Sequence, residues 1–514
     1  RTTDHWVFNL NTYHLRQRIL RVAKELSWLP GCVKDRVSDS IANRSDWSIS
    51  QRRIWGIPIP VFYCKKCDFQ VDVLESVNAS RELIDREGFA RWLAAKPEEI
   101  LPDDIVCDSC GERDFQWEMD TLGAEFISAL SYTAIPWSHK ELSWTADVCL
   151  GNNGKNEKWF QLSLLPSMAV EGSPPFKTAI VHGPVVNAVS VQEFMDKYGA
   201  DTLRLWAVSM NCKKRLNISH PHLEQVSKVH RRIRNLCRFL LGNLYDYDPE
   251  NDRVDYTYMQ EIDRWALHKL TKLIDGVTKA LENYQFHTMY RLLYDFCSGD
   301  MSSIYLSIVR RRLYTYPQWS SSRRSAQTVI YTVITTLARL MAPVFSFTAE
   351  EIWRNIPGVE KECPSVHLSN WPEVNRDFLN NELESRWDRL LKIRSEIYSL
   401  FERIRQKEGI GSVSQASVVL YPSSQEIYEL LDRYIDNLEE TFMVSKVRLM
   451  PLDAPVPDGI SEKNVKGLAI EISRTTGEKC ERCLIYSDTV GTNEQYPTLC
   501  YRCIAILEGG TYYV

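Results

Sequence analysis

Asp46-Trp47-Ser48-Ile49-Ser50-Gln51-Arg52-Arg53-Ile54-Trp55-Gly56-Ile57-Pro58-Ile59-Pro60 is the segment around which the expected fold can be laid out. Pro58 and Pro60 hold the residue before each of them in extended backbone, so the segment is predicted as strand or loop. Residues 61–118 follow with two Cys-x-x-Cys pairs, and a helix is predicted over 82–93 between the pairs. This arrangement predicts a small metal-binding module that contains an inserted helix.

Eight of the 14 cysteines form four Cys-x-x-Cys pairs, and the pairs themselves come in twos. The two quartets are Cys64, Cys67, Cys107 and Cys110, and Cys480, Cys483, Cys500 and Cys503. A Cys-x-x-Cys turn holds two thiolates about one tetrahedral edge apart, and two turns complete a closed four-sulfur shell suited to structural Zn²⁺. We therefore predict two structural zinc sites. The alternative is a set of buried or disulfide-bonded cysteines.

The pattern changes near residue 191 from α/β to almost wholly helical. Before that point, apolar runs such as 177–182 alternate with helix-like stretches. After it, amphipathic helices are predicted at about 222–246, 260–284, 286–312, 323–341 and 346–355, which together make a helical bundle. A charged helix over 381–408 and a small α+β region over 415–475 follow, ahead of the second cysteine quartet.

Composition limits the class of function. The 514 residues suffice for roughly three to four domains. The net charge of −5 argues against a protein that holds nucleic acid over its whole surface, so any RNA contact must come from local basic patches. We expect no membrane span and no export signal, because no apolar run approaches about 18 residues. Scattered thiols are typical of a reducing compartment, here the cytosol or an organelle matrix.

Several segments together resemble isoleucyl-tRNA synthetase of the bacterial or organellar type. Residues 46–60 resemble the family's D-W-C-I-S-R-Q-R-x-W-G-x-P-I-P, and residues 197–206 resemble its K-Y-G-A-D-x-L-R-L-W. Asn235 with residues 238–244 resembles the start of the anticodon-binding helical domain, and residues 347–353 match another of its helices. The terminal cysteine quartet resembles the family's carboxy-terminal zinc finger, which mainly distinguishes it from the valyl, leucyl and methionyl relatives.

The resemblance implies a fold in three parts: a partial Rossmann-like α/β catalytic domain, an all-α anticodon-binding bundle, and a small α+β and zinc-finger tail. The expected segments are a remnant of the catalytic domain at its junction with the editing domain (1–60), a zinc-binding insertion (61–118), the remainder of the Rossmann-like domain (119–190), a stem-contact linker (191–222), the anticodon-binding-like bundle (223–375), a long helix with a small α+β domain (376–475) and the zinc finger (476–514).

The chain departs from the family where the chemistry resides. The H-I-G-H segment and most or all of the editing domain are expected to be missing. The lysine loop D-x-x-G-R-K-M-S-K-S-L-G is expected to be missing too, because residues 182–186 run directly into Asn187-Ala188-Val189-Ser190. In the family those lysines stabilise charge that develops on the ATP phosphates, and no flanking residue replaces them.

Two adenylate-binding stretches are substituted as well. The family's D-V-W-F-D-S-G-S aligns with residues 123–130, and its G-S-D-Q-H-R-G-W-F aligns with residues 152–160. The substituted positions are Gly123, Glu125, Ile127, Gly154, Lys155 and Asn156. Losing a carboxylate that pairs with an ammonium group costs about 3–5 kcal/mol. We predict a retained fold with no intact catalytic residues, so ATP and Mg²⁺ would bind only to a working ligase.

Basic residues gather in patches that are suited to RNA phosphates. The candidates are Lys213, Lys214, Arg215, Arg231, Arg232, Arg234, Arg482 and Arg502, and Arg310-Arg311-Arg312 adds a further patch. The alternative for each is a solvated helix face paired with acidic residues. Leu484 stands where the family has a tryptophan after the second finger cysteine, which removes a stacking platform worth about 1–3 kcal/mol per base.

Two hypotheses follow from the sequence. The favoured one is a synthetase-derived protein without catalytic activity that binds tRNA or another structured RNA, or serves as a scaffold for a protein partner or larger assembly. The alternative is a genuine isoleucine–tRNA ligase represented by a fragment or incomplete gene product. A third, a zinc-dependent interaction module unrelated to tRNA, has no motif in its support.

Overall fold

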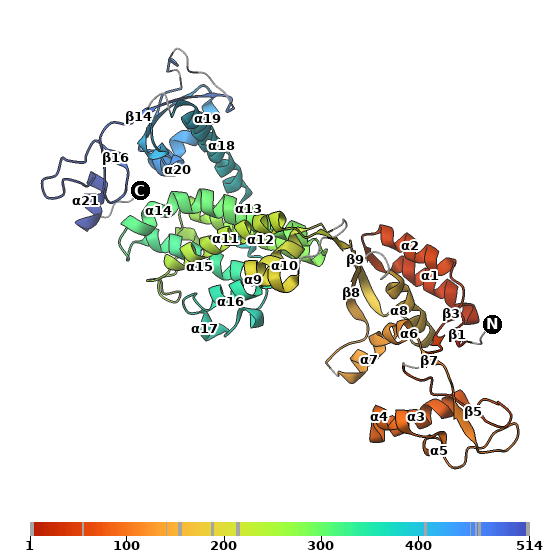
Figure 1. Ribbon diagram of the computed structural model, residues 1–514. Coiled ribbons are helices and arrows are strands. Elements are labelled where there is room, and N and C mark those ends of the chain that lie inside the picture. Colours follow the sequence, from red (N-terminus) through yellow and green to blue (C-terminus); the bar gives the residue numbers. More distant parts are fainter. Residues whose placement is uncertain are drawn as a thin grey trace. The chain divides into compact units, whose positions relative to one another are not determined.

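The computed structural model describes residues 5–53, 56–139, 141–152, 157–186, 190–211, 216–405, 409–452, 454–457, 460 and 464–509. The chain divides into two compact units, one made of Arg1–Val186 with Cys212–Asn217 and the other of Asn187–Asn211 with Ile218–Val514. Figure 1 draws the first unit in red to gold and the second in yellow to blue. Within the described ranges, no helix combines the length and apolar character needed to cross a lipid bilayer.

A three-stranded parallel sheet organises the first unit. Its order is β2-β9-β8, made of Ser27–Leu29, Phe176–His182 and Ala146–Asn152. Parallel neighbours need a crossover, and α8 (Glu157–Val170) provides it between β8 and β9. Helices α1 (Leu15–Glu25) and α2 (Cys32–Ala42) pack against each other and against α8, as Figure 1 shows. The predicted α/β character of this region is confirmed.

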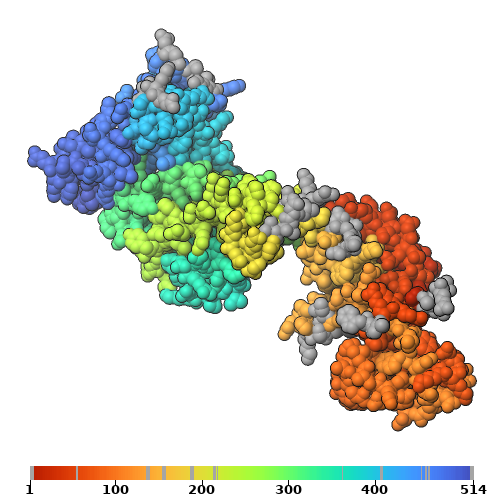
Figure 2. Space-filling model, in the orientation of Figure 1, coloured from red at the N-terminus to blue at the C-terminus, as the bar shows by residue number. Residues whose placement is uncertain are grey.

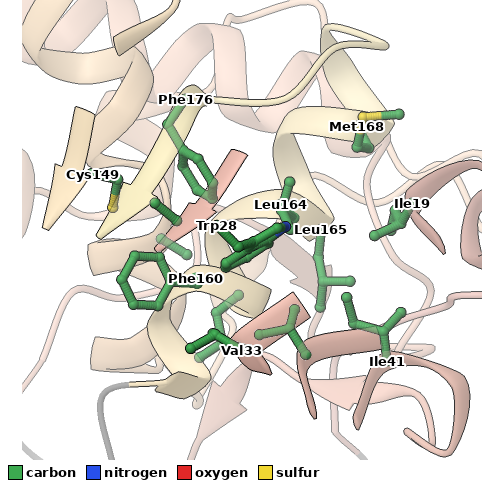
Figure 3. Close-up of a cluster of buried hydrophobic side chains, with 14 of the residues drawn as sticks. Ile19, Trp28, Val33, Ile41, Cys149, Phe160, Leu164, Leu165, Met168 and Phe176 are labelled. Atoms are coloured by element: carbon green, nitrogen blue, oxygen red, sulfur yellow. The ribbon is translucent and has the colours of Figure 1, made fainter. Parts of the chain in front are cut away.

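Trp28 on β2 lies in the middle of the core that covers this sheet (Figure 3). Its ring lies 6.0 Å from the ring of Phe160 on α8 and 6.0 Å from that of Phe176 on β9, in both cases edge to face. Aromatic quadrupoles favour this arrangement. Gly151 on β8 faces Phe160, and a Cβ there would come within 2.7 Å of the ring, so glycine is required. The packing of a Rossmann-like sheet is therefore intact.

Short elements complete the first unit. The strand pairs are β1 (Val7–Phe8) with β3 (Trp47–Ser48), β4 (Ser50–Gln51) with β7 (Thr121–Leu122), β5 (Phe62–Cys64) with β6 (Phe115–Trp117), and β10 (Val185–Val186) with β11 (Leu216–Asn217). The helices are α3 (Val73–Glu87), α4 (Phe89–Ala94), α5 (Pro97–Ile100), α6 (Ala124–Ala129) and α7 (Ser131–Ser138). The single helix predicted over 82–93 is wrong, because Gly88 takes a φ of +88° and separates α3 from α4.

The second unit is mainly the predicted helical bundle. Its helices are α9 (Val191–Tyr198), α10 (Ala200–Ser209), α11 (His220–Gly242), α12 (Glu261–Glu282), α13 (Phe286–Asp295), α14 (Leu306–Thr315), α15 (Ser321–Met341), α16 (Ser346–Trp353) and α17 (Val359–Glu362). Between α13 and α14 the backbone forms a π-helix, η3 (Phe296–Tyr305), where the sequence predicted continuous α-helix. Such segments widen the helix and often occur at functional sites.

Asp201 on α10 joins helices that are distant in sequence. Its carboxylate accepts hydrogen bonds from the N–H groups of Phe347 and Thr348 at 3.3 and 2.7 Å, and from the Thr348 hydroxyl at 2.6 Å. A carboxylate is favoured at these unpaired donors of the first turn of α16. Burial lowers the pKa of His230, whose ring bridges the hydroxyls of Thr202 and Thr348 at 3.1 Å each. These contacts fix α10 and α11 against α16.

A long helix and a small sheet follow the bundle. Helix α18 (Asn381–Ile404) leads to a sheet of order β13-β12-β14, made of Lys446–Leu449, Ala416–Pro422 and Leu468–Arg474. The remaining elements are α19 (Gln425–Arg433), α20 (Leu438–Phe442), β15 (Glu478–Lys479), β16 (Tyr486–Ser487) and α21 (Tyr501–Leu507). Figure 2 shows the blue surface of this tail continuing into the green surface of the bundle, as the contact between α14 and α20 requires.

Two arginines are buried in the bundle beside carboxylates. Arg312 on α14 is 2% exposed, and its Nη2 lies 2.6 Å from Oδ1 of Asp263 on α12. Arg323 on α15 is 4% exposed, and its Nη1 lies 2.6 Å from Oδ2 of Asp246. Each buried guanidinium thus has an opposite charge within hydrogen-bond distance, which offsets the cost of removing it from water.

Asp300 on η3 gives the stability of the bundle a dependence on pH. Burial raises the pKa of this carboxyl to about 6, although the Lys269 ammonium 3.8 Å away opposes the rise. The folded-state pKa lies above the unfolded value of about 3.9. The protonated form of Asp300 therefore favours the folded state. Its contribution to the free energy of unfolding is fully present below about pH 4 and is lost as the pH rises through 6.

We expect Asp300→Asn to stabilise the protein by about 1–3 kcal/mol at pH 8 relative to the wild type, and by much less at pH 4. The amide cannot ionise, so it avoids the cost of a buried carboxylate. Urea unfolding at the two pH values measures the difference. A stabilisation of the same size at both would contradict the expectation.

Candidate metal centres and nucleic-acid interface

The first cysteine quartet closes into a compact cluster. The sulfur of Cys67 lies 3.5 Å from those of Cys107 and Cys110, and the sulfurs of Cys64 and Cys110 are 3.6 Å apart. Four thiolates around a zinc ion with bonds of about 2.3 Å are separated by roughly 3.8 Å, so these sulfurs fit that ion. The module also has an apolar core of its own, in which Trp92 is 2% exposed.

The second quartet is equally compact. Its four sulfurs lie within 4.8 Å of one another, and those of Cys483 and Cys500 are 3.7 Å apart. The buried cluster of this finger consists of three of the cysteines themselves, and only partly buried side chains such as Val490 and Leu499 surround it. Ile504 and Ile506 on α21 are buried as well, but the cluster around the sulfurs holds no buried side chain other than cysteine, so the finger depends largely on bonds through its sulfurs for stability.

Three of the four Cys-x-x-Cys segments share one backbone turn. The residues that follow the second cysteine are Asp68, Gly111 and Leu484, with φ of +58°, +71° and +62°. The N–H of each donates to the carbonyl of the first cysteine at 2.7–2.9 Å. This tight turn brings two sulfurs to the same side. The fourth segment instead begins helix α21 at Cys500.

The two finger arginines make their hydrogen bonds within the protein. Arg482 donates from Nη2 to the carbonyl of Thr315, at the end of α14, at 2.8 Å, and from Nη1 to the carbonyl of Cys503 at 3.3 Å. Arg502 places Nη1 3.1 Å from Oε1 of Glu440 on α20. Both guanidinium groups therefore hold the finger against the bundle and the small domain.

The arginines of α11 are exposed. Arg231, Arg232 and Arg234 all lie on the open side of this helix. Arg232 donates to the hydroxyl of Tyr294 at 2.8 Å, while Arg234 donates to both oxygens of Glu351 at 2.8 and 2.9 Å. About half of each side chain in the Arg234–Glu351 pair is exposed, and an ion pair in that setting contributes about 1 kcal/mol or less. The pair therefore contributes little to holding Arg234 in place.

Two cavities flank α11. One, of about 760 Å³, is lined by Arg231, Arg234 and Arg238 together with Glu351. The other, of about 710 Å³, is lined by Arg232 and by side chains of η3 and α14, and no Asp or Glu is among its described lining residues. The sequence-predicted cations of α11 are thus divided between two cavities, with Arg231 and Arg234 in one and Arg232 in the other.

The run Arg310-Arg311-Arg312 separates into three environments, because successive helix residues point about 100° apart. Arg310 is exposed and lines the 710 Å³ cavity. Arg311 lies 3.6 Å from Glu440, and Arg312 is buried against Asp263. Arg310 is the most exposed of the three, and Arg311 lines a neighbouring cavity of about 590 Å³ while paired with Glu440.

Three of the substituted adenylate positions lie at the start of α6. Gly123 is buried, and its N–H donates to the carbonyl of Ile49 at 2.8 Å. A Cβ added to Gly123 would lie 3.3 Å from that carbonyl oxygen, which is a tight contact. Glu125 is exposed and Ile127 half-buried, while Phe126 between them packs 5.6 Å from the Trp47 ring. The segment is thus packed against residues 47–49, and neither Gly123 nor Ile127 carries a charged group.

Other predicted positions lie outside the described residues. They are Gly154, Lys155 and Asn156 of the second adenylate stretch, and Lys213, Lys214 and Arg215 of the basic patch. Sequence reasoning in turn missed Arg394 on α18 and the hydroxyls that η3 turns into the 710 Å³ cavity, those of Ser298, Ser302 and Ser303. A run of small polar residues in an apolar helix was the one available signal for the serines.

Comparison with known proteins places these features in a family. The model of "tRNA synthetases class I (I, L, M and V)" matches residues 1–219, that of the "Anticodon-binding domain of tRNA ligase" matches 263–420, and that of the "Zinc finger found in FPG and IleRS" matches 477–506. Among solved structures, the LeuRS of a LeuRS–tRNA–LeuAMS ternary complex from Agrobacterium radiobacter is similar at a TM-score of 0.48 and 18% identity, over 65% of this chain and 43% of that one. A likeness that distant adds nothing to the sequence matches.

Curated relatives match almost the whole chain. The isoleucine–tRNA ligase of Caldanaerobacter subterraneus subsp. tengcongensis is 39% identical over 99% of this chain and 55% of that protein. Those of Thermoanaerobacter pseudethanolicus and Moorella thermoacetica are 38% and 37% identical, each over 99% of this chain and 56% of the relative. The chain spans about half the length of the curated relatives that it matches. Over 99% of its length the chain is homologous to isoleucine–tRNA ligases, and it carries the class I synthetase, anticodon-binding and zinc-finger domains that the family models describe.

Proposed function

We propose that this chain binds tRNA through the arginine face of α11 and does not by itself form isoleucyl-adenylate. The observation that carries the binding half is the placement of Arg231, Arg234 and Arg238 along one cavity beside an anticodon-binding domain. Their planar guanidinium groups suit bidentate contacts to phosphate oxygens. Binding through such contacts is electrostatic and therefore weakens with salt.

The proposal that the chain does not form isoleucyl-adenylate rests on charged side chains that are missing at internal positions of the sequence. Gly123 and Ile127 stand where the family has acidic residues, and no lysine loop separates Val186 from Val191. An enzyme stabilises the charge of adenylate and triphosphate with preorganised opposite charges, and each one lost costs a large factor in rate. Neutral residues at these positions supply none of that stabilisation.

Two zinc ions complete the proposal as structural cofactors. Each quartet offers four thiolates and no open coordination position, which is the pattern of structural rather than catalytic zinc. Reduced thiolates of this kind persist in a reducing compartment, such as the cytosol or an organelle matrix. Under this proposal the chain by itself uses neither ATP nor Mg²⁺.

The second candidate is isoleucine–tRNA ligase activity of a longer protein to which this chain belongs. The 37–39% identity to isoleucine–tRNA ligases over 99% of the chain favours it. In that case other parts of the longer protein would supply the missing charged groups, and the reaction would require ATP with Mg²⁺.

Two measurements on the purified chain separate the candidates. We expect no isoleucine-dependent ATP–pyrophosphate exchange above background, together with a salt-sensitive shift of tRNA on a native gel. Replacing Arg231, Arg234 and Arg238 together with glutamine is expected to weaken tRNA binding about 10- to 1000-fold and to lower the salt slope by about 2–3, because each phosphate contact contributes roughly 0.9 to the slope. The control is the double variant Arg253→Gln/Arg376→Gln, which neutralises exposed arginines elsewhere in the same unit.

Rapid ATP–pyrophosphate exchange by this chain would support the ligase candidate and reject the proposal that the chain forms no isoleucyl-adenylate. An absence of both exchange and tRNA binding would instead favour a scaffold for a protein partner. Equal weakening in the α11 variant and in the control would show that binding is unspecific and does not use the α11 face.

A further inference from the structure

Arg394 on α18 is deeply buried, and within the described ranges no carboxylate forms an ion pair with it. It is 5% exposed, close to the 2% and 4% of Arg312 and Arg323. Those two arginines each have a carboxylate oxygen at 2.6 Å. Burying a charge without a counter-charge is unfavourable unless other groups accept its hydrogen bonds, so the acceptors around Arg394 decide how well it is accommodated.

The hydrogen bonds of Arg394 go to neutral acceptors. Its Nη2 donates to the Ser303 carbonyl at 3.2 Å, to the Ser307 hydroxyl at 2.9 Å and to the Tyr398 hydroxyl at 3.2 Å. The same nitrogen lies 3.3 Å from the sulfur of Met443, a thioether that accepts only weakly. Its Nη1 is buried and has no acceptor among the described residues. The guanidinium is therefore only partly satisfied by the protein.

Met443, the weak acceptor, borders open space. It directly follows α20, is half-buried, and lines both the 710 Å³ cavity and the adjoining cavity of about 590 Å³. Small polar reagents that enter either cavity can therefore reach its side chain. Three methionines of the bundle, Met289, Met301 and Met341, are at most 1% exposed and have no such access.

Oxidation changes what Met443 can offer the guanidinium. Hydrogen peroxide transfers one oxygen to a thioether: an S–O bond forms, the O–O bond breaks, the sulfur loses two electrons, and the other oxygen leaves as water with both hydrogens. The product is a sulfoxide, whose polar oxygen is a much better acceptor than the thioether sulfur. Because the sulfur lies 3.3 Å from Nη2 of Arg394, an oxygen bonded to that sulfur is within reach of the guanidinium.

We propose that Met443 is a site of reversible oxidation to methionine sulfoxide by peroxides, with the sulfoxide oxygen bound by the Arg394 guanidinium. Sulfoxide formation usually disrupts a packed region, because it places a polar oxygen among apolar side chains. Here the oxygen meets a buried donor that is short of acceptors, so the effect on stability has the opposite sign. A dithiol reduces the sulfoxide back to the thioether and is itself oxidised to a disulfide, with release of water.

The new hydrogen bond would join two elements of the second unit. Arg394 belongs to the long helix α18, and Met443 follows α20 of the small domain. Ser303 on η3 and Ser307 on α14 accept from the same guanidinium, so the bundle takes part in the contact as well. Oxidation of Met443 thus fastens the small domain to α18 and the bundle. The site does not depend on the proposed binding of RNA.

Glutamine in place of Met443 tests the contact without an oxidant. Its side-chain carbonyl places an oxygen near that of the sulfoxide, so Met443→Gln is expected to raise the melting temperature of the whole zinc-loaded chain by about 2–4 °C. In an Arg394→Met background the same substitution should not stabilise the protein. The matched control is Met450→Gln, at a half-buried methionine whose sulfur makes no hydrogen bond in the described part of the chain; it should leave the melting temperature unchanged or lower it.

Limiting hydrogen peroxide tests the oxidation itself. Mass spectrometry of the treated, folded protein should find Met443 and the 77% exposed Met119 oxidised, and Met289, Met301 and Met341 intact. Peroxide also attacks cysteine thiolates, so Met443→Leu receives the same dose and shows the effect of thiol damage alone. The change in melting temperature on treatment should be about 2–4 °C more positive in the wild type than in Met443→Leu. A methionine sulfoxide reductase with a dithiol should remove this difference.

Each outcome decides for or against the site. Stabilisation by Met443→Gln that disappears in the Arg394→Met background supports the contact. A folded Met443→Gln protein that melts no higher than the wild type, or no higher than Met450→Gln, overturns it, and this comparison suffices if Arg394→Met does not fold. Met443 that stays intact at a dose which oxidises Met119 overturns its assignment as an oxidation site.

Discussion

Asp263→Ala is expected to lower the free energy of unfolding of the helical bundle by about 3–5 kcal/mol. The carboxylate is fully buried and accepts from Arg312 at 2.6 and 2.9 Å, from the Tyr305 hydroxyl at 2.8 Å and from the Ser325 hydroxyl at 2.5 Å. Removing it leaves a guanidinium that is 2% exposed without a counter-charge and two hydroxyls without their acceptor. Hydrogen exchange of the amides of α12, α14 and α15 measures the loss within this unit.

Two control variants show whether the cost arises from burial of charge. Glu351→Ala breaks the exposed pair with Arg234 and is expected to change stability by about 1 kcal/mol or less. The double variant Asp263→Leu/Arg312→Met removes both members of this buried pair and is expected to recover most of the stability, because neither charge is then left buried without its partner. A loss below 1 kcal/mol in Asp263→Ala would contradict the argument.

Cys503→Ala is expected to remove one zinc ion per chain and to unfold the terminal finger, residues 477–509, while the bundle stays folded. The reason is the content of the finger core, whose buried cluster is made of Cys480, Cys500 and Cys503 themselves. Metal binding in such modules is worth about 10–16 kcal/mol in isolated peptides, and here Ile504 and Ile506 are the only other buried side chains among the described residues of the finger. Metal analysis should fall from about two zinc ions per chain to about one.

The first quartet provides the contrast. Cys107→Ala is also expected to remove one zinc ion, but Phe62, Trp92 and Phe115 keep an apolar core in that module, so more of its structure should persist. Limited proteolysis should therefore cut the terminal finger of Cys503→Ala faster than the first module of Cys107→Ala. Cys32→Ala, at an exposed cysteine outside both clusters, should retain both ions. Wild-type protein without zinc would overturn the assignment of both centres.

Features set by neighbouring residues were predictable from the sequence. The two sulfur clusters are one case, because a Cys-x-x-Cys turn is a local structure, and the long helices of the bundle are another, because their apolar spacing is local too. The strand over the apolar run 177–182 belongs to the same class. Local patterns did not reveal the break at Gly88, where a single positive φ divides a stretch of helix-forming residues.

Features set by distant partners were not predictable. Arg482 and Arg502 look like exposed cations in the sequence, yet their partners are the Thr315 carbonyl and Glu440, which lie 167 and 62 residues away. Arg394 looks like one more charge on a solvated helix, and only the packing of η3 and Met443 against α18 buries it. The π-helix itself escapes prediction because its residues have the same apolar spacing as a continuous α-helix.

The walls of the 710 Å³ cavity and of an adjoining cavity of about 590 Å³ come from α11, η3, α14, α18 and the zinc finger, from Arg232 to Ile485 along the sequence. Few of these residues are neighbours in the chain, so the two cavities exist together only when the bundle, α18 and the finger are folded against one another. A ligand that occupies both cavities should therefore raise the melting temperature of the entire unit, whereas a clipped chain without its final forty residues keeps every lining residue of the 710 Å³ cavity and loses only the finger side of the other.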